Sequence, residues 1–308
     1  MNTTILQNSN QNRQNDKNSQ PKLIENKFLN TILDYARAYQ TGCLTVQETT
    51  GKKQTWFLYF RLGRLFWAAG GDQEQRRVYR QLVNHFPKEA RQLLSHIQEV
   101  TWDSPSAYYN FLAYLHQQEK MSMEEFIAMK NYIMLEILFD IVQIDCQNSQ
   151  EENLTWEWDK NGRPKNYIAV DRKLARSSEQ LVHITQSNWS KWEEANFSAC
   201  YPNQAPIMVN QEEIEQATSP KIFQNLQRLV NGKQSLRDIA VSTKSNILQV
   251  AKFLWEYYEK GWLEFEEISD LDWLKIAPQL KSQTSESSQL ESVRNSLVEM
   301  KETQTRAA

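Results

Sequence analysis

The stretch "FLYFRLGRLFWAAGG", from Phe57 to Gly71, combines two arginines with three glycines, a composition that could serve phosphate binding. A phosphate-binding loop has a fixed spacing, GxxxxGK[ST] or GxGxxG, and joins a strand to the N-terminus of a helix. Neither spacing occurs in the chain, and Gly63 is followed by a second strand-like run. The stretch therefore predicts two strands joined by a turn and no nucleotide site.

The residues that most often carry catalysis or hold metals are scattered. No HExxH, CxxC, GxSxG, kinase motif set or paired-carboxylate signature occurs. The four histidines fall in separate helical stretches, at His85, His96, His116 and His183. The chain has three cysteines, Cys43, Cys146 and Cys200, an odd number with no CxxC pair. This pattern is typical of a protein from a reducing compartment. We expect no enzymatic activity, no cofactor, no metal and a cytoplasmic location.

Positive charge gathers around the opening stretch. Seven lysines and arginines between Gly51 and Arg80 face only Asp72 and Glu74, a net charge of +5. One interpretation is solvated turns and an exposed helix face. The other is a docking surface for an acidic partner, because complementary charge steers protein encounters. The candidate docking residues are Arg61, Arg64, Arg76, Arg77 and Arg80.

The overall composition is that of an ordinary globular chain. Its 308 residues are 24% charged and 40% hydrophobic, and the net charge is −3. Such a balance predicts no general attraction to nucleic acid or anionic lipid. No apolar run approaches the roughly 18 residues of a membrane-spanning helix, and the N-terminus lacks an apolar signal core. We expect no membrane insertion.

The order of elements predicts an α+β fold: a small antiparallel β-meander, a mostly helical body and a C-terminal winged-helix-like subdomain. Five of the eight glycines lie between 42 and 71 and separate three runs rich in β-branched and aromatic residues. These runs predict strands over 43–48, 54–60 and 64–69. A further alternating run, Leu154 to Trp158, predicts another strand.

Helical spacing dominates after Asp72. "QEQRRVYRQLVNHF" has an apolar face, and the next helix opens at Pro87. A further helix is expected near Pro105, capped by Asp103 or Ser104. The stretch 122–145 starts with a capping box, Ser122 to Glu125, and is apolar on most of its circumference, so we expect it to be the central buried helix. One long helix is expected from Asp171.

The last third predicts three helices and a strand, the order of a winged-helix unit related to helix-turn-helix. The helices end at Asn231–Gly232, cover 236–241 and cover 246–260, and "WLEFEE" is the expected wing strand. We expect the third helix to be buried through Ile247, Val250, Leu254 and Tyr257. Residues 250–275 carry a net charge of −4, which a phosphate backbone would repel, so we do not expect nucleic-acid binding.

The ends of the chain are polar. Half of residues 1–20 are Asn or Gln, a composition that cannot bury enough apolar surface to offset its ordering entropy. We expect a disordered tail over 1–22, the α+β region over 23–207, the winged-helix-like subdomain over 208–275 and a polar linker or tail over 276–308.

Two quoted stretches carry a family resemblance. "GCLTV…TWFLYFRLGRLFWAAGG…RRVYRQL" and "NGKQSLRDIAVSTKSNILQVAKFLWEYYEKGWLEF" make the chain similar, over roughly 24–270, to the PATAN domain, the DUF4388-like N-terminal domain of PatA. The first stretch is the more specific. PATAN domains occur in cyanobacterial two-component response regulators of the PatA, PixE and PixG types.

The resemblance implies a non-enzymatic signalling adaptor. Its expected partners in phototaxis are a type IV pilus motor ATPase or platform protein, or a blue-light photoreceptor. The alternative is a transcriptional or cell-patterning regulator that uses the winged-helix-like unit. Such regulators usually carry a receiver domain with a phosphorylatable Asp, which is not seen in these 308 residues, so the resemblance does not imply phosphorylation control of them. The oligomeric state stays open.

Overall fold

The computed structural model describes residues 26–99, 104–147, 153–163, 168 and 176–273. The predicted polar ends, 1–22 and 276–308, lie outside these residues. The fold is α+β, as predicted, with one four-stranded and one two-stranded antiparallel sheet. Among the helices that the structure describes, none has the length and apolar composition needed to span a bilayer.

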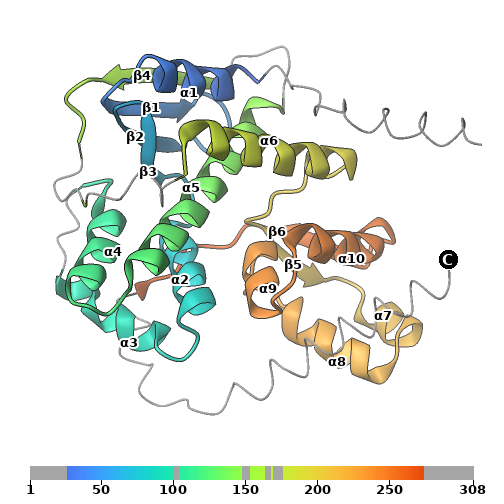
Figure 1. Ribbon diagram of the computed structural model, residues 1–308. Coiled ribbons are helices and arrows are strands. Elements are labelled where there is room, and N and C mark those ends of the chain that lie inside the picture. The colour runs from blue at the N-terminus through green and yellow to red at the C-terminus, as the bar shows by residue number, and fades with distance from the viewer. Residues whose placement is uncertain (1–25, 100–103, 148–152, 164–167, 169–175, 274–308) are drawn as a thin grey trace, which may run out of the picture.

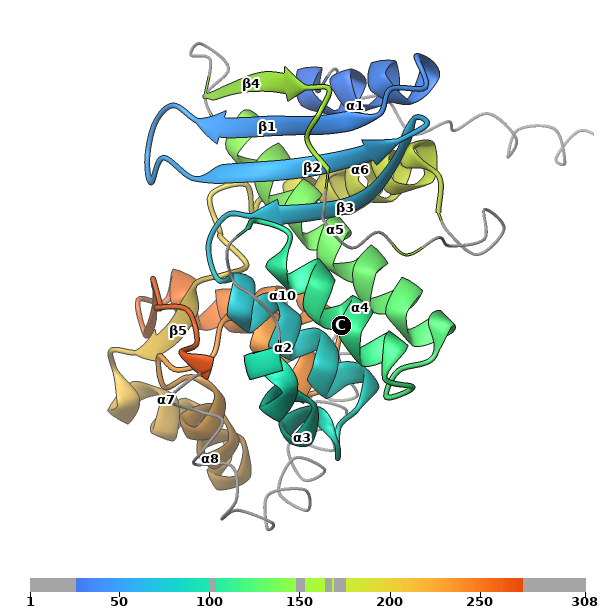
Figure 2. The ribbon, with the colours of Figure 1, turned by 90° about the vertical axis from the view of Figure 1, so that its left-hand side faces the viewer.

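The main sheet has the strand order β3-β2-β1-β4 (Figure 2). Its strands are β1 (Gly42–Glu48), β2 (Thr55–Arg61), β3 (Arg64–Gly70) and β4 (Leu154–Asp159). The first three form the predicted meander, and their ends fall within one residue of the predicted runs. Strand β4 returns from much later in the chain and pairs with the free side of β1.

The turn between β2 and β3 requires glycine at position 63. Leu62 and Gly63 both have positive φ, 46° and 75°, as a two-residue hairpin turn needs. A Cβ on Gly63 would lie 2.3 Å from the carbonyl oxygen of Ala36. The Gly63 N–H donates to the carbonyl of Gln40 at 2.9 Å, and its own carbonyl accepts from Ser178 Oγ at 2.8 Å. The absence of a side chain at Gly63 therefore allows the turn to pack closely against the helices that contain Ala36 and Ser178.

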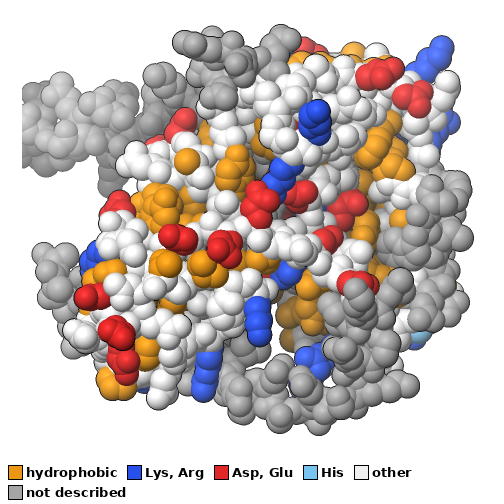
Figure 3. Space-filling view, turned by 180° about the vertical axis from the view of Figure 1, so that it is seen from behind, with side chains coloured by type: hydrophobic (Ala, Val, Ile, Leu, Met, Phe, Trp, Pro, Cys, Tyr) orange, Lys and Arg blue, Asp and Glu red, His pale blue; other side chains and the backbone are white. Residues whose placement is uncertain are grey.

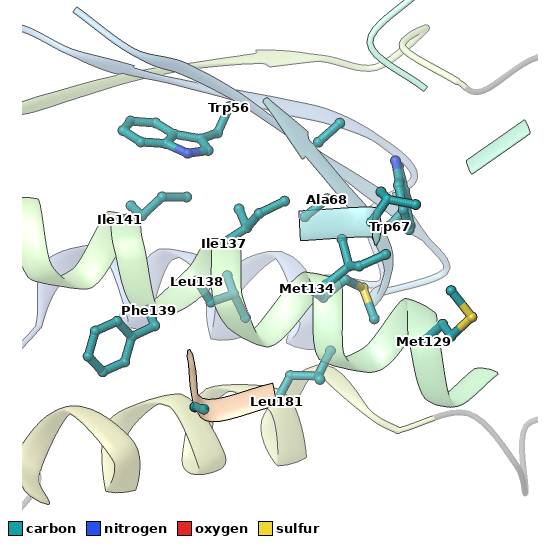
Figure 4. Close-up of a cluster of buried hydrophobic side chains, with 14 of the residues drawn as sticks. Trp56, Trp67, Ala68, Met129, Met134, Ile137, Leu138, Phe139, Ile141 and Leu181 are labelled. Atoms are coloured by element: carbon teal, nitrogen blue, oxygen red, sulfur yellow. The ribbon is translucent and has the colours of Figure 1, made fainter. Parts of the chain in front are cut away.

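Helix α5 (Met123–Asp145) crosses beneath the sheet and is buried around most of its circumference, as predicted. In Figure 4, Ile137 and Ile141 point toward Trp56 of the sheet, and Leu138 points to the opposite side, where Leu181 of the neighbouring helix lies. All five side chains have no exposed surface. The helix thus joins two layers of one hydrophobic core.

The predicted capping box at the start of α5 is present. Ser122 Oγ accepts from the Glu125 N–H at 3.2 Å, and the Glu125 carboxylate accepts from the Ser122 N–H at 2.9 Å. The two groups satisfy backbone donors that the first turn leaves unpaired.

The other helices of the first region pack around α5 (Figure 1). Helices α1 and α6 lie on the side of the sheet where α5 lies (Figure 2). Helices α2, α3 and α4 lie around the other end of α5. The helices of the first region besides α5 are α1 (Lys27–Arg37), α2 (Glu74–His85), α3 (Ala90–Leu94), the 3-10 helix η1 (Ser95–Glu99), α4 (Ala107–Gln117) and α6 (Ser178–Glu194). Helix α1 has no counterpart among the sequence predictions.

Three predicted helix starts are wrong. The helix expected from Pro87 begins only at Ala90, because residues 87–89 form a turn. Helix α4 begins after Ser106, whose carbonyl accepts the first intrahelical bond from Asn110 at 3.0 Å, so Ser104 is not its cap. Asp103 lies outside the described residues. Helix α6 begins at Ser178 rather than at Asp171, because Ser177 and Gln180 form a second capping box.

The winged-helix-like unit has the three predicted helices and the wing strand, and it begins with a strand and a short helix that were not predicted. It comprises β5 (Ala205–Met208), α7 (Gln211–Ala217), α8 (Pro220–Leu229), α9 (Leu236–Ser242), α10 (Ile247–Glu259) and β6 (Leu263–Glu266). Strand β5 pairs antiparallel with β6, so the predicted boundary at 208 falls at the end of a strand of this unit.

Only part of the predicted burial of α10 is correct. Val250 and Leu254 are buried. Ile247 and Tyr257 are half-buried. Ile247 faces a groove beside the helix, and the Tyr257 ring lies at the edge of the helix, 5.4 Å from the ring of Phe253.

Candidate functional site

A groove of about 1150 Å³ separates α5 and α6 from the α9–α10 turn. Figure 1 shows α6 above α10, with α5 beside them. The groove is therefore formed jointly by the first region and the winged-helix-like unit. Its apolar lining includes Ile127, Leu135 and Phe139 of α5, Ile184 and Trp192 of α6, Val241 of α9, and Ile247 and Leu248 of α10.

The helix starts and turns around the groove are well fixed. The α6 capping box sets where that helix begins, and the chain turns sharply between α9 and α10 at Lys244, whose φ is 51°. Asn246 then caps α10 by accepting from the Leu248 N–H at 2.9 Å. These local contacts set where α6 and α10 begin.

Tyr132 is the most exposed aromatic side chain of the groove. Its side of α5 faces the opening, and the residue is 49% exposed. Deeper in the groove, Phe139 and Trp192 are almost fully buried, and their rings meet edge to face at 5.8 Å. The groove thus combines an aromatic floor with an exposed aromatic group at its mouth.

The exposed charges of the groove are mostly positive. Arg176, Lys191 and Lys244 are exposed lining residues, and Glu124 is the exposed carboxylate among them. Three cations and one carboxylate give these positions a net charge of +2. Such a rim favours an acidic partner segment.

The floor is braced by a buried network of ion pairs between α2, α5 and α9. Arg80 Nη1 lies 3.0 Å from Asp238 Oδ1, and its other terminal nitrogen pairs with Glu136. Arg237 Nη2 lies 2.8 Å from Asp140 Oδ1. Because α9 belongs to the winged-helix-like unit, the network joins that unit to the first region.

Two further arginines of α2 extend the network. Arg76 Nη1 lies 2.8 Å from Asp238 Oδ2, and Arg76 also donates to the carbonyl of Ser269 at 3.0 Å. Arg77 is 2% exposed and donates to the carbonyls of Gly70 and Asp72 at 3.1 and 3.0 Å. Arg77 thereby holds the end of β3 against α2.

Mutual charge keeps the central pair ionised. Burial alone would lower the pKa of Arg80, but Glu136 and Asp238 outweigh it and hold that pKa above its ordinary value. Burial would raise the pKa of Asp238, but Arg80 and Arg76 outweigh it and hold that pKa below its ordinary range. Arg80 and Asp238 are therefore both charged at neutral pH.

The structure does not bring the five candidate docking arginines together on one surface. Arg76, Arg77 and Arg80 lie in the internal network, where they are turned toward carboxylates and backbone carbonyls. Arg61 and Arg64 lie opposite each other at the β2–β3 turn, outside the groove lining. The expectation of a single exposed basic surface is wrong, because helix α2 packs its arginines inward against acidic groups of later elements.

The acidic members of the network were not among the predicted site residues. Glu136 and Asp140 are four residues apart on a mostly apolar helix, so they share one face. Charged groups on a buried helix need partners, and this signal in the sequence could have indicated an internal ion pair.

Lys130 is a second buried charge of α5. It is 3% exposed, and burial lowers its pKa to about 8. Its Nζ lies 5.9 Å from the ring centroid of Phe126. No sequence prediction singled it out.

Among the histidines and cysteines, the structure gives individual environments for His116, Cys43 and Cys200. His116 Nδ1 is 2.9 Å from the carbonyl oxygen of Met121, and burial raises the pKa of Cys43 and Cys200 to about 12. In the described part of the chain, no three His, Cys, Asp or Glu side chains gather where they could hold a metal ion.

Comparison of the chain with protein-family models, curated proteins and solved structures gives no match.

Proposed function

We propose that this chain is a non-enzymatic signalling adaptor whose groove binds a helical segment of a partner protein. The observation that carries the proposal is the groove between α5, α6 and the α9–α10 turn. Its volume of about 1150 Å³ exceeds the roughly 300–1,000 Å³ of ordinary small-molecule pockets. An apolar floor of this size suits the apolar face of an amphipathic helix.

The rim supports an acidic partner segment. Arg176, Lys191 and Lys244 surround the opening, and complementary charge would speed association and select the partner. Together with the resemblance to PATAN domains, this favours a phototaxis partner. The candidates are a type IV pilus motor ATPase or platform protein, or a blue-light photoreceptor, bound within a two-component system of a cyanobacterium.

The winged-helix-like unit supports a second candidate, a transcriptional or cell-patterning regulator. On α10, Glu256 and Glu259 are exposed, and Lys252 is the exposed cation of the same helix. This acidic balance weighs against DNA. We expect no binding to random duplex at about 150 mM salt, where phosphate contacts are already weakened. A nanomolar affinity in a gel shift would replace the adaptor proposal with the regulator.

The adaptor proposal is tested with purified candidate partners. The affinity of the full chain for each partner is measured by calorimetry, and then repeated with Tyr132→Ala and with the double charge reversal Lys191→Glu, Lys244→Glu. Tyr132→Ala should weaken binding by tenfold or more, since an aromatic side chain that becomes buried against the partner typically contributes 2 kcal/mol or above. The charge reversal should mainly slow association and reduce its salt dependence.

Arg228→Glu is the matched control, because Arg228 is an exposed cation of α8 outside the groove. All variants should keep the wild-type melting temperature. A partner that binds the wild type and the Tyr132→Ala variant equally would place the docking surface elsewhere.

A further inference from the structure

A second surface lies on α10 and β6, outside the groove. The rings of Trp255, Tyr258 and Phe265 are in mutual contact, with centroids 4.5 Å apart for Trp255–Tyr258 and 5.3 Å apart for Tyr258–Phe265. Tyr258 is 40% exposed, and the other two are half-buried. Beneath them, the buried Phe197 lies 5.0 Å from Trp255. We call these three residues the aromatic triad.

A carboxylate lies next to the aromatic triad. Glu259 Oε1 accepts from Trp255 Nε1 at 3.0 Å. The exposed Glu264 and Glu266 precede and follow Phe265 on β6, and their side chains point to the opposite face of the strand. Seen from behind, the molecule carries hydrophobic and acidic side chains next to one another on the side where α10 lies (Figure 3). The surface has the opposite charge to the rim of the groove.

Two neighbouring rings, Tyr257 on α10 and Trp262 just after that helix, have their own cation. Lys260 Nζ lies 4.7 Å from the ring centroid of Trp262 and 5.9 Å from that of Tyr257. Over the aromatic triad, the described residues of the chain place no lysine or arginine. The exposed Tyr258 ring and the Glu259 carboxylate are thus available to a cation from another molecule.

We propose that the aromatic triad is a docking surface for an arginine-bearing segment of a partner protein. A guanidinium is planar and weakly hydrated, so it can stack on the Trp255 or Tyr258 ring and still donate to Glu259. Lysine offers a strongly hydrated point charge and loses the stacking contribution. This surface is separate from the groove, so the chain can hold an acidic segment and a basic segment at the same time.

The probe is a short synthetic peptide of alternating arginine and serine, compared with the same peptide containing lysine. Binding to the full chain is measured by calorimetry at about 150 mM ionic strength, where exposed charges are well screened. The arginine peptide should bind several-fold more tightly than the lysine peptide. Tyr258→Ala and Glu259→Gln should each lower the affinity for the arginine peptide by about two- to fivefold. Equal affinity of the two peptides would overturn the proposal.

Two controls separate this surface from general electrostatics and from the groove. Glu215→Gln removes an exposed charge from α7 of the same unit and should leave peptide binding unchanged; an equal loss would show nonspecific attraction and contradict the proposal. Tyr132→Ala, which tests the groove, should also leave it unchanged. If the wild type self-associates and Tyr258→Ala abolishes that association without any peptide binding, the occupant is a second copy and the proposal is wrong.

Discussion

Replacing Arg80 by methionine should destabilise the protein by about 3 kcal/mol. Arg80 is 3% exposed and pairs with both Glu136 and Asp238. Removing one partner of a buried ion pair typically costs about 3–5 kcal/mol, because the remaining charge is left without compensation. The lower end applies here, since Asp238 keeps Arg76 at 2.8 Å and Glu136 keeps a bond from Gln81 at 3.2 Å.

The measurement is urea unfolding of the full chain, followed by circular dichroism and by tryptophan fluorescence. A change in midpoint at constant slope would report stability alone. The control is Arg228→Met, the same substitution at an exposed site of α8, which should stay within about 0.5 kcal/mol of the wild type. A loss below about 1 kcal/mol for Arg80→Met would refute the assignment of this arginine to a structural network.

A double-mutant cycle separates the ion pair from simple packing. Arg80→Met, Asp238→Asn and the double variant should give a coupling energy of about 1–3 kcal/mol, as expected for residues of one network. Additive losses would mean that Arg80 acts through its aliphatic stem alone.

Three more predictions concern pH, a buried lysine and a glycine. The pKa of Asp238 is lowered in the folded protein, so the stability from its ionised form is present above the ordinary Asp pKa of about 4 and lost as the pH falls through the lower folded value. Asp238→Asn should therefore flatten the acid side of the stability profile measured by urea unfolding. Burial lowers the pKa of Lys130 to about 8, so stability should rise with pH between about 8 and 10.5, where the unfolded chain still holds the proton. Lys130→Met should remove that rise and increase the unfolding midpoint at pH 7; an unchanged rise would implicate another group. Gly63→Ala should lower stability by about 2 kcal/mol or more in the same assay, because of the positive φ and the 2.3 Å approach to Ala36, whereas a neutral effect would show that the turn can rearrange.

Local signals predicted most of the elements. Glycine spacing gave the three strands of the meander, and the Ser122–Glu125 box together with all-round apolarity gave the central helix. These features depend on neighbours within a few residues, which is why they can be read without a fold. The start of α6 was misplaced because the Ser177–Gln180 box lies inside a longer run of helix-forming residues.

The candidate site depended on contacts that no local pattern specifies. The groove takes its walls from α5, α6 and the α9–α10 turn, which are more than 100 residues apart along the chain at their extremes. The arginines of α2 show as a positive run in the sequence, yet their partners Glu136 and Asp238 lie 56 and 158 residues away. A net charge counted along the chain cannot show which charges will meet.

The sequence by itself determined that the chain folds as α+β, where five of its six described strands and its central helix lie, and that a winged-helix-like unit follows. Only the tertiary structure decided that the arginines of α2 are internal and that the groove and the aromatic triad form separate surfaces. The physical reason is range: turn and helix preferences act over a few residues, whereas a buried charge is placed by whichever distant group can compensate its lost hydration.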